Sequence, residues 1–344
     1  MDNSENIRGV AGPYGFRLLT WAVAVLLMTA SRAAPALELG NHPAIQELID
    51  EMVSQHQFER IELERLFRQV AIRDNVVRAM KRPAERLPWH RYRSLFISDQ
   101  SIQNGVTFWA RHQTTLERAS EQYGVPAQII VAIIGVETRY GKVLGKHRVL
   151  DSLTTLVLRY PRREKFFRRE LVEFLLLSRE EGFDPLALLG SYAGAMGVPQ
   201  FMPSSYREYA IDFSGDARRD LISEPADAIG SVANYLARHR WRSGKPVVAK
   251  ATVAAGVNID GLVSKRLKPE STVAALSQAG IQIDDSPGAD TAAALMRFET
   301  LDGVDYRVGY GNFFVVTRYN TSRLYALAVY ELSEAILARW NHSQ

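Results

Sequence analysis

The side chain with the clearest chemical potential is Glu137, which ends an almost wholly apolar run that starts at Ile129. Pro126 suits the first position of a helix, so this run predicts a core helix. Helical spacing places Glu137 on the same stripe as Ile133 and Ile134. Because loss of hydration raises the pKa of a carboxylic acid in such surroundings, Glu137 is a candidate proton donor near neutral pH.

A structural role for Glu137 is the alternative interpretation. At a helix end it could form an ion pair with Arg139 or Lys142. Structural ion pairs perturb the pKa of a carboxylate as catalytic surroundings do, so this stretch by itself leaves both roles open.

A second segment suited to ligand contact is the stretch 190–206, which is rich in Gly, Ala, Met, Pro and Ser and poor in charge. Such a composition predicts a loop in which the backbone can approach a ligand closely. A tight packing loop without function is the alternative.

The elements that must position these residues are mostly helices. Hydrophobic periodicity predicts helical segments over 43–80, 102–123, 163–179, 226–239, 271–279 and 324–339. Gly124 is expected to end the second of them. Residues 247–253, 296–298 and 307–317 are rich in β-branched and aromatic residues, which predicts strands.

The composition indicates where the protein acts and which classes of partner it can bind. The chain has 344 residues, 47% of them hydrophobic, with a net charge of +4 and no cysteine. Residues 1–36 have the basic, apolar and small-residue regions of a secretory signal peptide, which predicts export to the periplasm. An uncleaved inner-membrane anchor is the alternative. Without cysteine we expect no lipid anchor, and without a basic stripe or a nucleotide-binding motif we expect no nucleic acid partner.

Five separated blocks resemble the lytic murein transglycosylase B family. They are GVETRYG at 135–141, GSYAGAMG at 190–197, PQFMPSSY at 199–206, DAIGSVANY at 227–235 and TRYN at 317–320. The similarity runs from about residue 43 to about residue 335. The resemblance implies an enzyme with a core like goose-type lysozyme that cleaves the β-1,4 bond between N-acetylmuramic acid and N-acetylglucosamine. Its product would carry a 1,6-anhydromuramyl end.

This chemistry would explain why the motifs near Glu137 hold no second carboxylate. Ordinary glycosidases need two, but an intramolecular hydroxyl needs no activated water. Glu137 would act first as the general acid and then as the base. A hydrolytic muramidase acting on the same bond and a non-catalytic peptidoglycan-binding protein are the alternatives.

The resemblance also assigns substrate contacts and partners. Family residues that contact the sugar match Ser191, Gln200, Tyr235, Tyr319, Asn320, Tyr325 and Tyr92. Rings suit the C–H faces of sugars, while amides and phenols suit their hydroxyls. The expected partners are peptidoglycan glycan strands, with proteins of cell-wall synthesis or division as further candidates.

A loop downstream of these motifs has the spacing of calcium ligands. Asp212, Ser214 and Asp216 place oxygen atoms at alternating positions, and Asp227 could add another. Some family members bind calcium here. Ala217 replaces the glycine of the sharp turn, so a polar loop without metal is the alternative. Catalysis itself is expected to need no cofactor, and a calcium ion would be structural.

Together these observations predict a mainly α (α+β) protein. We expect a signal peptide over 1–36, an α-helical region over 37–120, a lysozyme-like catalytic core over 121–241 and a small α/β subdomain over 242–318. Residues 319–344 would return to the catalytic site and end in a closing helix.

Overall fold

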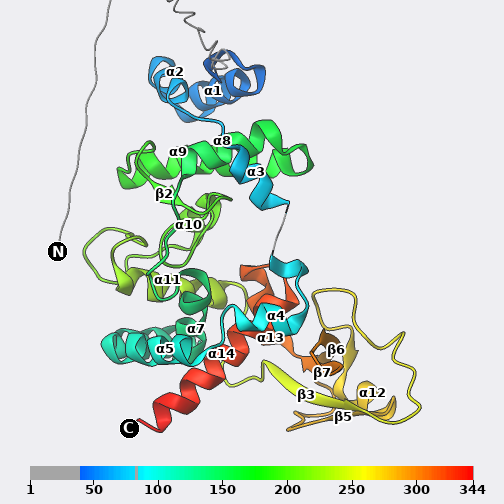
Figure 1. Ribbon diagram of the computed structural model, residues 1–344. Helices are drawn as coiled ribbons and strands as arrows, with labels where there is room; N and C mark the ends of the chain where they lie inside the picture. The colour runs from blue at the N-terminus through cyan, green and yellow to red at the C-terminus, as the bar shows by residue number, and fades with distance from the viewer. Residues whose placement is uncertain (1–38, 82–83, 344) are drawn as a thin grey trace, which may run out of the picture. The chain divides into compact units, whose positions relative to one another are not determined.

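The computed structural model describes residues 39–81 and 84–343, and helices dominate this part of the chain (Figure 1). Together with one antiparallel sheet of five strands, they confirm the prediction of a mainly α (α+β) fold. The expected signal peptide lies outside the described residues. Within them, no helix has both the length and the hydropathy needed to cross a bilayer.

The first group of helices follows the predicted segment 43–80. It comprises α1 (Pro43–His56), α2 (Arg60–Arg68) and α3 (Asp74–Met80), and it packs on α8 (Val149–Arg159) and α9 (Glu164–Glu181). Figure 1 shows α1 and α2 next to α8 and α9. The stripe Ile45, Leu48, Ile49 and Met52 of α1 is fully buried, as an amphipathic helix requires.

Asp151 joins this group to the rest of the protein. Its side chain is 1% exposed. It accepts hydrogen bonds from Ala71 N at 3.1 Å, from Arg73 Nε at 3.0 Å and from Arg148 Nη2 at 2.8 Å. A buried carboxylate held in this way tolerates the loss of hydration only while its partners stay in place.

We therefore expect Asp151→Ala to lower the free energy of unfolding by about 1–3 kcal/mol, because it leaves Ala71 N and the partly exposed guanidinium groups of Arg73 and Arg148 without their shared acceptor. Urea denaturation measures this. Asp50→Ala is the control, because it removes the exposed Asp50–Arg60 ion pair and should have a much smaller effect. Equal losses in the two variants would contradict the assignment.

The second group of helices forms the core around α7 (Ala127–Thr138), which is buried on nearly all sides. Its neighbours are α5 (Asp99–Arg111), α6 (Gln113–Tyr123), α11 (Pro225–Arg238) and α14 (Arg323–Asn341). The prediction of one helix over 102–123 was wrong in one respect, because the chain breaks at His112 between α5 and α6. Gly124 ends α6 in a left-handed conformation, as expected.

The sheet has the strand order β4-β6-β7-β3-β5. Its strands are β3 (Val248–Val253), β4 (Ser271–Thr272), β5 (Ile281–Ile283), β6 (Ala292–Glu299) and β7 (Val304–Gly309). Helix α12 (Val273–Gln278) accompanies them. In the register, Leu295 of β6 faces Val308 of β7 and Ala249 of β3 faces the same Val308. The strands over 247–253 and 296–298 and the helix over 271–279 are thus confirmed.

The strand predicted over 307–317 was wrong beyond Gly309. The chain turns at Tyr310 into α13 (Gly311–Tyr319). Helical spacing puts Phe313 and Val316 on one face, and both are fully buried in the main hydrophobic core, where α13 packs on α14. This burial overrides the strand preference of aromatic and β-branched residues.

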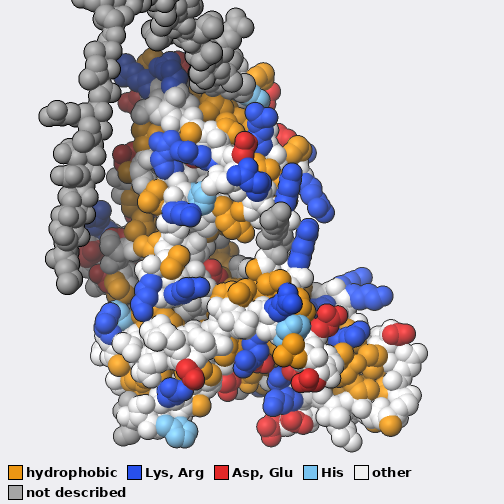
Figure 2. All heavy atoms as spheres, in the orientation of Figure 1, with side chains coloured by type: hydrophobic (Ala, Val, Ile, Leu, Met, Phe, Trp, Pro, Cys, Tyr) orange, Lys and Arg blue, Asp and Glu red, His pale blue; other side chains and the backbone are white. Residues whose placement is uncertain are grey.

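Short elements complete the described chain. They are η1 (Leu39–Asn41), η2 (Ala84–Arg86), α4 (Trp89–Ser94), η3 (Pro161–Arg163), α10 (Pro203–Tyr209) and the strand pair β1 (His147–Arg148) and β2 (Leu189–Gly190). On the face seen in Figure 2, Lys and Arg side chains are scattered among other types and do not form one stripe.

Candidate functional site

Glu137 lies in the last turn of α7, and the backbone after it holds this helix end in place. Arg139 ends α7 in a left-handed conformation with a φ of 51°. Thr138 Oγ1 donates to Val198 O at 2.9 Å and accepts from Gly141 N at 3.0 Å. Because Thr138 is fully buried, these bonds fix the position of Glu137 relative to the loop at 196–201.

The Glu137 carboxyl group contacts a tyrosine from the other end of the chain. Tyr325, in the first turn of α14, donates its hydroxyl to Glu137 Oε1 at 2.6 Å. Burial raises the pKa of Glu137 to about 7, although the hydrogen bond from Tyr325 opposes this and the charge of Glu85 adds to it. Glu137 makes no ion pair with another described residue, so the alternative pairing with Arg139 or Lys142 is wrong. Part of its surface stays accessible.

Glu85, on η2, is a second carboxylate near Glu137 that the sequence motifs did not contain. Asn320 Nδ2 donates to Glu85 Oε1 at 3.2 Å. The Glu85 charge also raises the pKa of Tyr92 and of Tyr192, in each case after the larger effect of burial. Glu85 precedes Glu137 by more than fifty residues in a segment without periodicity, so only tertiary structure reveals its proximity.

Aromatic residues predicted to contact substrate gather around the acid. Tyr325 stacks with Tyr319 at a ring distance of 6.3 Å, and Tyr319 meets Tyr235 edge to face at 4.9 Å. Tyr319 donates to Pro199 O at 2.7 Å, and Tyr235 donates to Arg318 O at 2.6 Å. These two hydroxyl groups therefore join segments of the site.

Tyr92 and Asn320 are related to Glu137 less directly, Tyr92 through the charge of Glu137 and Asn320 through its hydrogen bond to Glu85. Tyr92, on α4, is 1% exposed, and the charge of Glu137 contributes to raising its pKa. Asn320 follows Tyr319 and is partly exposed, and its amide nitrogen donates a hydrogen bond to Glu85. The ring of Tyr92 is therefore buried near the charges of Glu85 and Glu137, and the amide of Asn320 is held by Glu85.

The loop that carries Ser191 and Gln200 is held by the side chains of both residues. Ser191 Oγ accepts from Ala195 N at 3.0 Å. Gln200 has a φ of 51°, and its Nε2 donates to Gly197 O at 2.9 Å and to Leu144 O at 3.1 Å. These contacts occupy the amide nitrogen of Gln200 and leave its oxygen available as an acceptor.

Two substitutions should move the pH dependence of Glu137 in opposite directions. Glu85→Gln removes a charge that raises the pKa of Glu137, so activity should fall at a lower pH than in the wild type. Tyr325→Phe removes a hydrogen bond that lowers this pKa, so the fall should move to higher pH.

The pH dependence of kcat/KM on solubilised glycan strands, the substrate that the resemblance implies, measures both shifts. Glu121→Gln, which removes an exposed charge on α6, is the control and should leave the profile unchanged. Shifts of the same sign in the two site variants would contradict these assignments.

The predicted calcium ligands form a separate group. Carboxylate oxygens of Asp212, Asp216 and Asp227 lie within 4.8 Å of one another, and Ser214 Oγ donates to Asp212 at 3.2 Å. Ala217 adopts the left-handed conformation of the missing glycine, with a φ of 68°. The arrangement therefore fits part of a calcium shell, which takes six to eight oxygen ligands.

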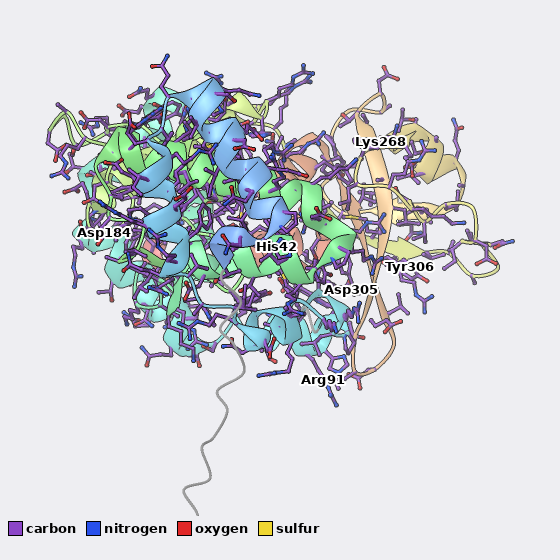
Figure 3. All side chains as sticks on the ribbon, turned by 90° about the horizontal axis from the view of Figure 1, so that it is seen from above. His42, Arg91, Asp184, Lys268, Asp305 and Tyr306 are labelled. Carbon is purple, nitrogen blue, oxygen red and sulfur yellow. The ribbon has the colours of Figure 1, made fainter. Side chains whose placement is uncertain are left out.

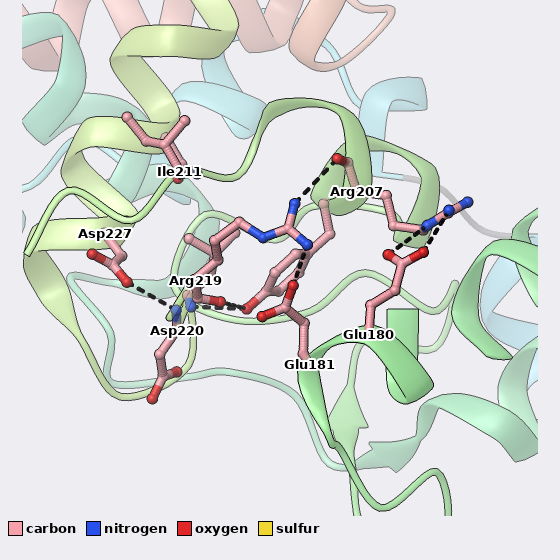
Figure 4. A network of polar contacts seen from close by, with 10 residues as sticks. Glu180, Glu181, Arg207, Ile211, Arg219, Asp220 and Asp227 are labelled. Carbon is pink, nitrogen blue, oxygen red and sulfur yellow. Dashed lines mark hydrogen bonds and ion pairs between the residues drawn. The ribbon is translucent and has the colours of Figure 1, made fainter. Parts of the chain in front are cut away.

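Hydrogen bonds to a buried carboxylate hold this loop in place. Asp227 is fully buried and accepts from Phe213 N and Ser214 N, each at 2.8 Å, and from Asp220 N at 2.9 Å. Arg219, next to Asp220, pairs with Glu181 at the end of α9, and Figure 4 shows these residues together. The loop geometry is thus supported by protein contacts as well as suited to a cation.

Comparison with known proteins identifies the family. The transglycosylase SLT domain family matches residues 40–334. Membrane-bound lytic murein transglycosylase B of Escherichia coli (strain K12) is 44% identical over 313 residues, which cover 88% of this chain and 85% of that protein. Among solved structures, the catenated lytic transglycosylase SltB1 of Pseudomonas aeruginosa has a TM-score of 0.83 and 46% identity, covering 88% of this chain and 99% of its own.

The Escherichia coli lytic transglycosylase Slt35, solved in complex with calcium, has a TM-score of 0.80 and 44% identity. This match covers 87% of this chain and 94% of that one. This chain is therefore similar to these proteins in both sequence and structure over nearly all of its described residues. The chain belongs to the lytic murein transglycosylase B family.

Proposed function

We propose that this protein cleaves the β-1,4 bond between N-acetylmuramic acid and N-acetylglucosamine in peptidoglycan and forms a 1,6-anhydromuramyl end. The observation that carries the assignment of the acid is the Glu137 carboxyl group. Burial raises its pKa to about 7, and it accepts a hydrogen bond from the Tyr325 hydroxyl. A carboxylic acid in that state can give up and recover a proton at neutral pH.

In the first step the protonated Glu137 donates its proton to the glycosidic oxygen, and the bond from that oxygen to muramyl C1 breaks. The acetamido group of the muramyl residue stabilises C1, as in other substrate-assisted cases. The Glu137 carboxylate then takes the proton of the C6 hydroxyl, and the oxygen of that hydroxyl forms the new bond to C1. The carboxyl group is thereby restored, and no water is consumed.

The surrounding residues would bind and orient the sugars. Tyr319, which is partly exposed, would offer a ring face for C–H groups, while Tyr92 and Tyr235, which are buried, would act by packing behind the surface of the site. The Gln200 amide oxygen, the Ser191 hydroxyl and the Asn320 amide are suited to sugar hydroxyls. Tyr325 would stabilise Glu137 while it is a carboxylate, because its own buried phenol stays protonated and can donate.

The test is mass spectrometry of the muropeptides that the protein, without residues 1–36, releases from purified sacculi. We expect anhydromuramyl ends, whose mass is lower by one water than that of reducing ends. Reducing ends alone would reject the transglycosylase assignment, and no release would favour a binding role.

Glu85 favours one alternative, a hydrolytic muramidase. A second carboxylate beside the acid could activate water as a base, as inverting glycosidases require. Glu85 is exposed and its charge acts on Glu137, which meets part of that requirement. Glu85→Gln separates the two reactions: it should only shift the pH profile of a transglycosylase, but it should abolish turnover of a hydrolase.

For the loop with Asp212, Asp216 and Asp227, we propose a structural calcium ion, with Ser214 as a further oxygen ligand. Support comes from the three converging carboxylates and from the calcium complex of Slt35. We expect millimolar calcium to raise the melting temperature and Asp212→Asn/Asp216→Asn to remove this effect, since binding to the native state stabilises it. The same rise in the double variant, or with magnesium, would contradict a specific site.

We further propose that the protein acts in the periplasm after export by its signal peptide. The proposed substrate, peptidoglycan, supports this location. The name of the Escherichia coli relative, a membrane-bound lytic murein transglycosylase, supports it too. Processing of residues 1–36, seen as the N-terminus of the protein isolated from cell envelopes, tests the proposal against an uncleaved anchor.

A further inference from the structure

The turn that follows Glu137 has an unfavourable backbone conformation. Arg139, Tyr140 and Gly141 have φ values of 51°, 63° and 81°, so three successive residues are left-handed. Glycine adopts this conformation without a steric cost, but other residues keep it only where the surrounding structure holds them. The N–H group of Tyr140 donates to Ile134 O at 3.3 Å, which closes the end of α7. The turn is therefore part of the helix end that carries Glu137.

The Tyr140 side chain lies between two helices at a point where each of them has a buried glycine, Gly105 in α5 and Gly135 in α7. A Cβ at Gly135 would lie 2.7 Å from both Cζ and the hydroxyl oxygen of Tyr140. A Cβ at Gly105 would lie 2.8 Å from the same oxygen. Glycine inside a helix is less favourable than alanine, so its presence at both positions indicates that the space is needed. We call the space between Gly105 and Gly135 the glycine slot.

Further contacts fix the Tyr140 ring in the glycine slot. Its hydroxyl donates to Ser101 O of α5 at 2.9 Å, and the ring lies 5.8 Å from that of Phe108 on the same helix. A Cβ at Gly105 would also lie 2.6 Å from Ile336 Cδ1 of α14. The helices α5, α7 and α14 therefore meet at this slot, and the first turn of α14 carries the hydroxyl group that contacts the proposed acid.

We propose that Tyr140 is a positioning residue for Glu137. By filling the glycine slot, its ring holds the left-handed turn after α7 and keeps the Glu137 carboxyl group in contact with the Tyr325 hydroxyl. This inference rests on the proposed function, because it explains how the proposed acid is held in place. Without the ring the turn can relax to a more favourable backbone, and the last turn of α7 moves with it.

The experiment compares Tyr140→Ala with Tyr140→Phe, which keeps the ring in the slot and loses only the hydroxyl group. Gly135→Ala tests the same slot from α7, because its Cβ would displace the ring. Tyr306→Ala is the matched control, since it removes a partly buried tyrosine ring from the smaller hydrophobic cluster. Figure 3 shows Tyr306 of β7 on the sheet side of the molecule. Melting temperatures verify that all variants fold.

We expect Tyr140→Ala and Gly135→Ala each to lower kcat on solubilised glycan strands roughly 10–100-fold with KM little changed, because the acid acts in the chemical step and depends on its exact position. Tyr140→Phe and Tyr306→Ala should keep kcat close to the wild-type value. In the double variant Gly135→Ala/Tyr140→Ala, the fall should equal that of Tyr140→Ala, since no ring remains to be displaced. Multiplied effects in the double variant would contradict an action of Gly135 through the ring.

A second readout, the ionisation of Glu137, does not depend on the reaction. Burial raises the pKa of Glu137 to about 7, so a carboxyl group released toward water should titrate nearer its ordinary value of 4.5. We expect this fall in Tyr140→Ala and not in Tyr306→Ala. Carbon-13 NMR of protein labelled at the glutamate carboxyl groups follows it, with Glu137→Gln to assign the signal. The variants leave in place the ionisable groups whose charge interacts with Glu137, which are Tyr325, Tyr319, Tyr92 and Glu85.

An unchanged pKa of Glu137 in the folded Tyr140→Ala and Gly135→Ala variants would overturn the proposal, and so would an equal change in Tyr306→Ala. The proposed function is tested separately by the anhydromuramyl ends that the wild type makes. If the wild type makes none, the proposed function fails, and the titration of Glu137 still decides whether Tyr140 positions this group.

Discussion

Glu137→Gln is expected to reduce turnover of sacculi by about 10³-fold or more while the protein stays folded. Gln has nearly the shape of Glu but can neither donate a proton to the glycosidic oxygen nor take one from the C6 hydroxyl. General acid–base catalysis contributes about 10²–10⁴-fold for one positioned group, and Glu137 would serve in both steps. The measurement is the rate of release of anhydromuropeptides.

The stability of this variant provides the control. Burial raises the pKa of Glu137 from its ordinary value of 4.5 to about 7, so the folded state holds this proton more tightly than the unfolded state. Stability contributed by Glu137 is therefore present at low pH and is lost as pH rises through 7. At pH 8 the Gln variant should melt at or above the wild-type temperature. A large fall in melting temperature would indicate a structural role.

Gly145→Ala is expected to disrupt the loop that carries Ser191. Gly145 has a φ of 102°, and a Cβ here would overlap the carbonyl group of Gly190 and lie 2.7 Å from Ser191 N. These contacts are with backbone, so no side chain can move aside. We expect a loss of about 2–5 kcal/mol in the free energy of unfolding, from left-handed strain and overpacking together.

The same substitution should also reduce activity. Gln200 donates to Leu144 O next to Gly145, so a shift of this segment displaces both Gln200 and Ser191. A misplacement of about 1 Å in a site can cost on the order of 10²-fold in rate. The free energy of unfolding from denaturant titration and kcat/KM measure the two effects.

Gly182→Ala is the matched control. Gly182 ends α9 with a φ of 69°, but a Cβ here would meet no atom within 4 Å. It should therefore cost only the left-handed strain, about 1–2 kcal/mol, and leave activity unchanged. Equal effects of the two substitutions would show that the close approach of Gly145 to Gly190 is unimportant.

The sequence by itself determined the features that depend on neighbours in the chain. The apolar run before Glu137 both forms α7 and removes water from the carboxyl group, so the direction of its pKa shift could be predicted. The amphipathic stripe of α1 and the glycine that ends α6 follow from local periodicity and local backbone freedom. The order of the five motif blocks indicated the family for the same reason, since each block is continuous in the chain.

Only the tertiary structure decided which distant residues meet. Tyr325 lies 188 residues after Glu137, and Asn320 lies 235 residues after Glu85, so no local pattern relates them. The segment after Gly309 forms α13 because Phe313 and Val316 find a buried place against α14. Long-range packing determines these positions, because the free energy of burying a side chain depends on what the fold brings beside it.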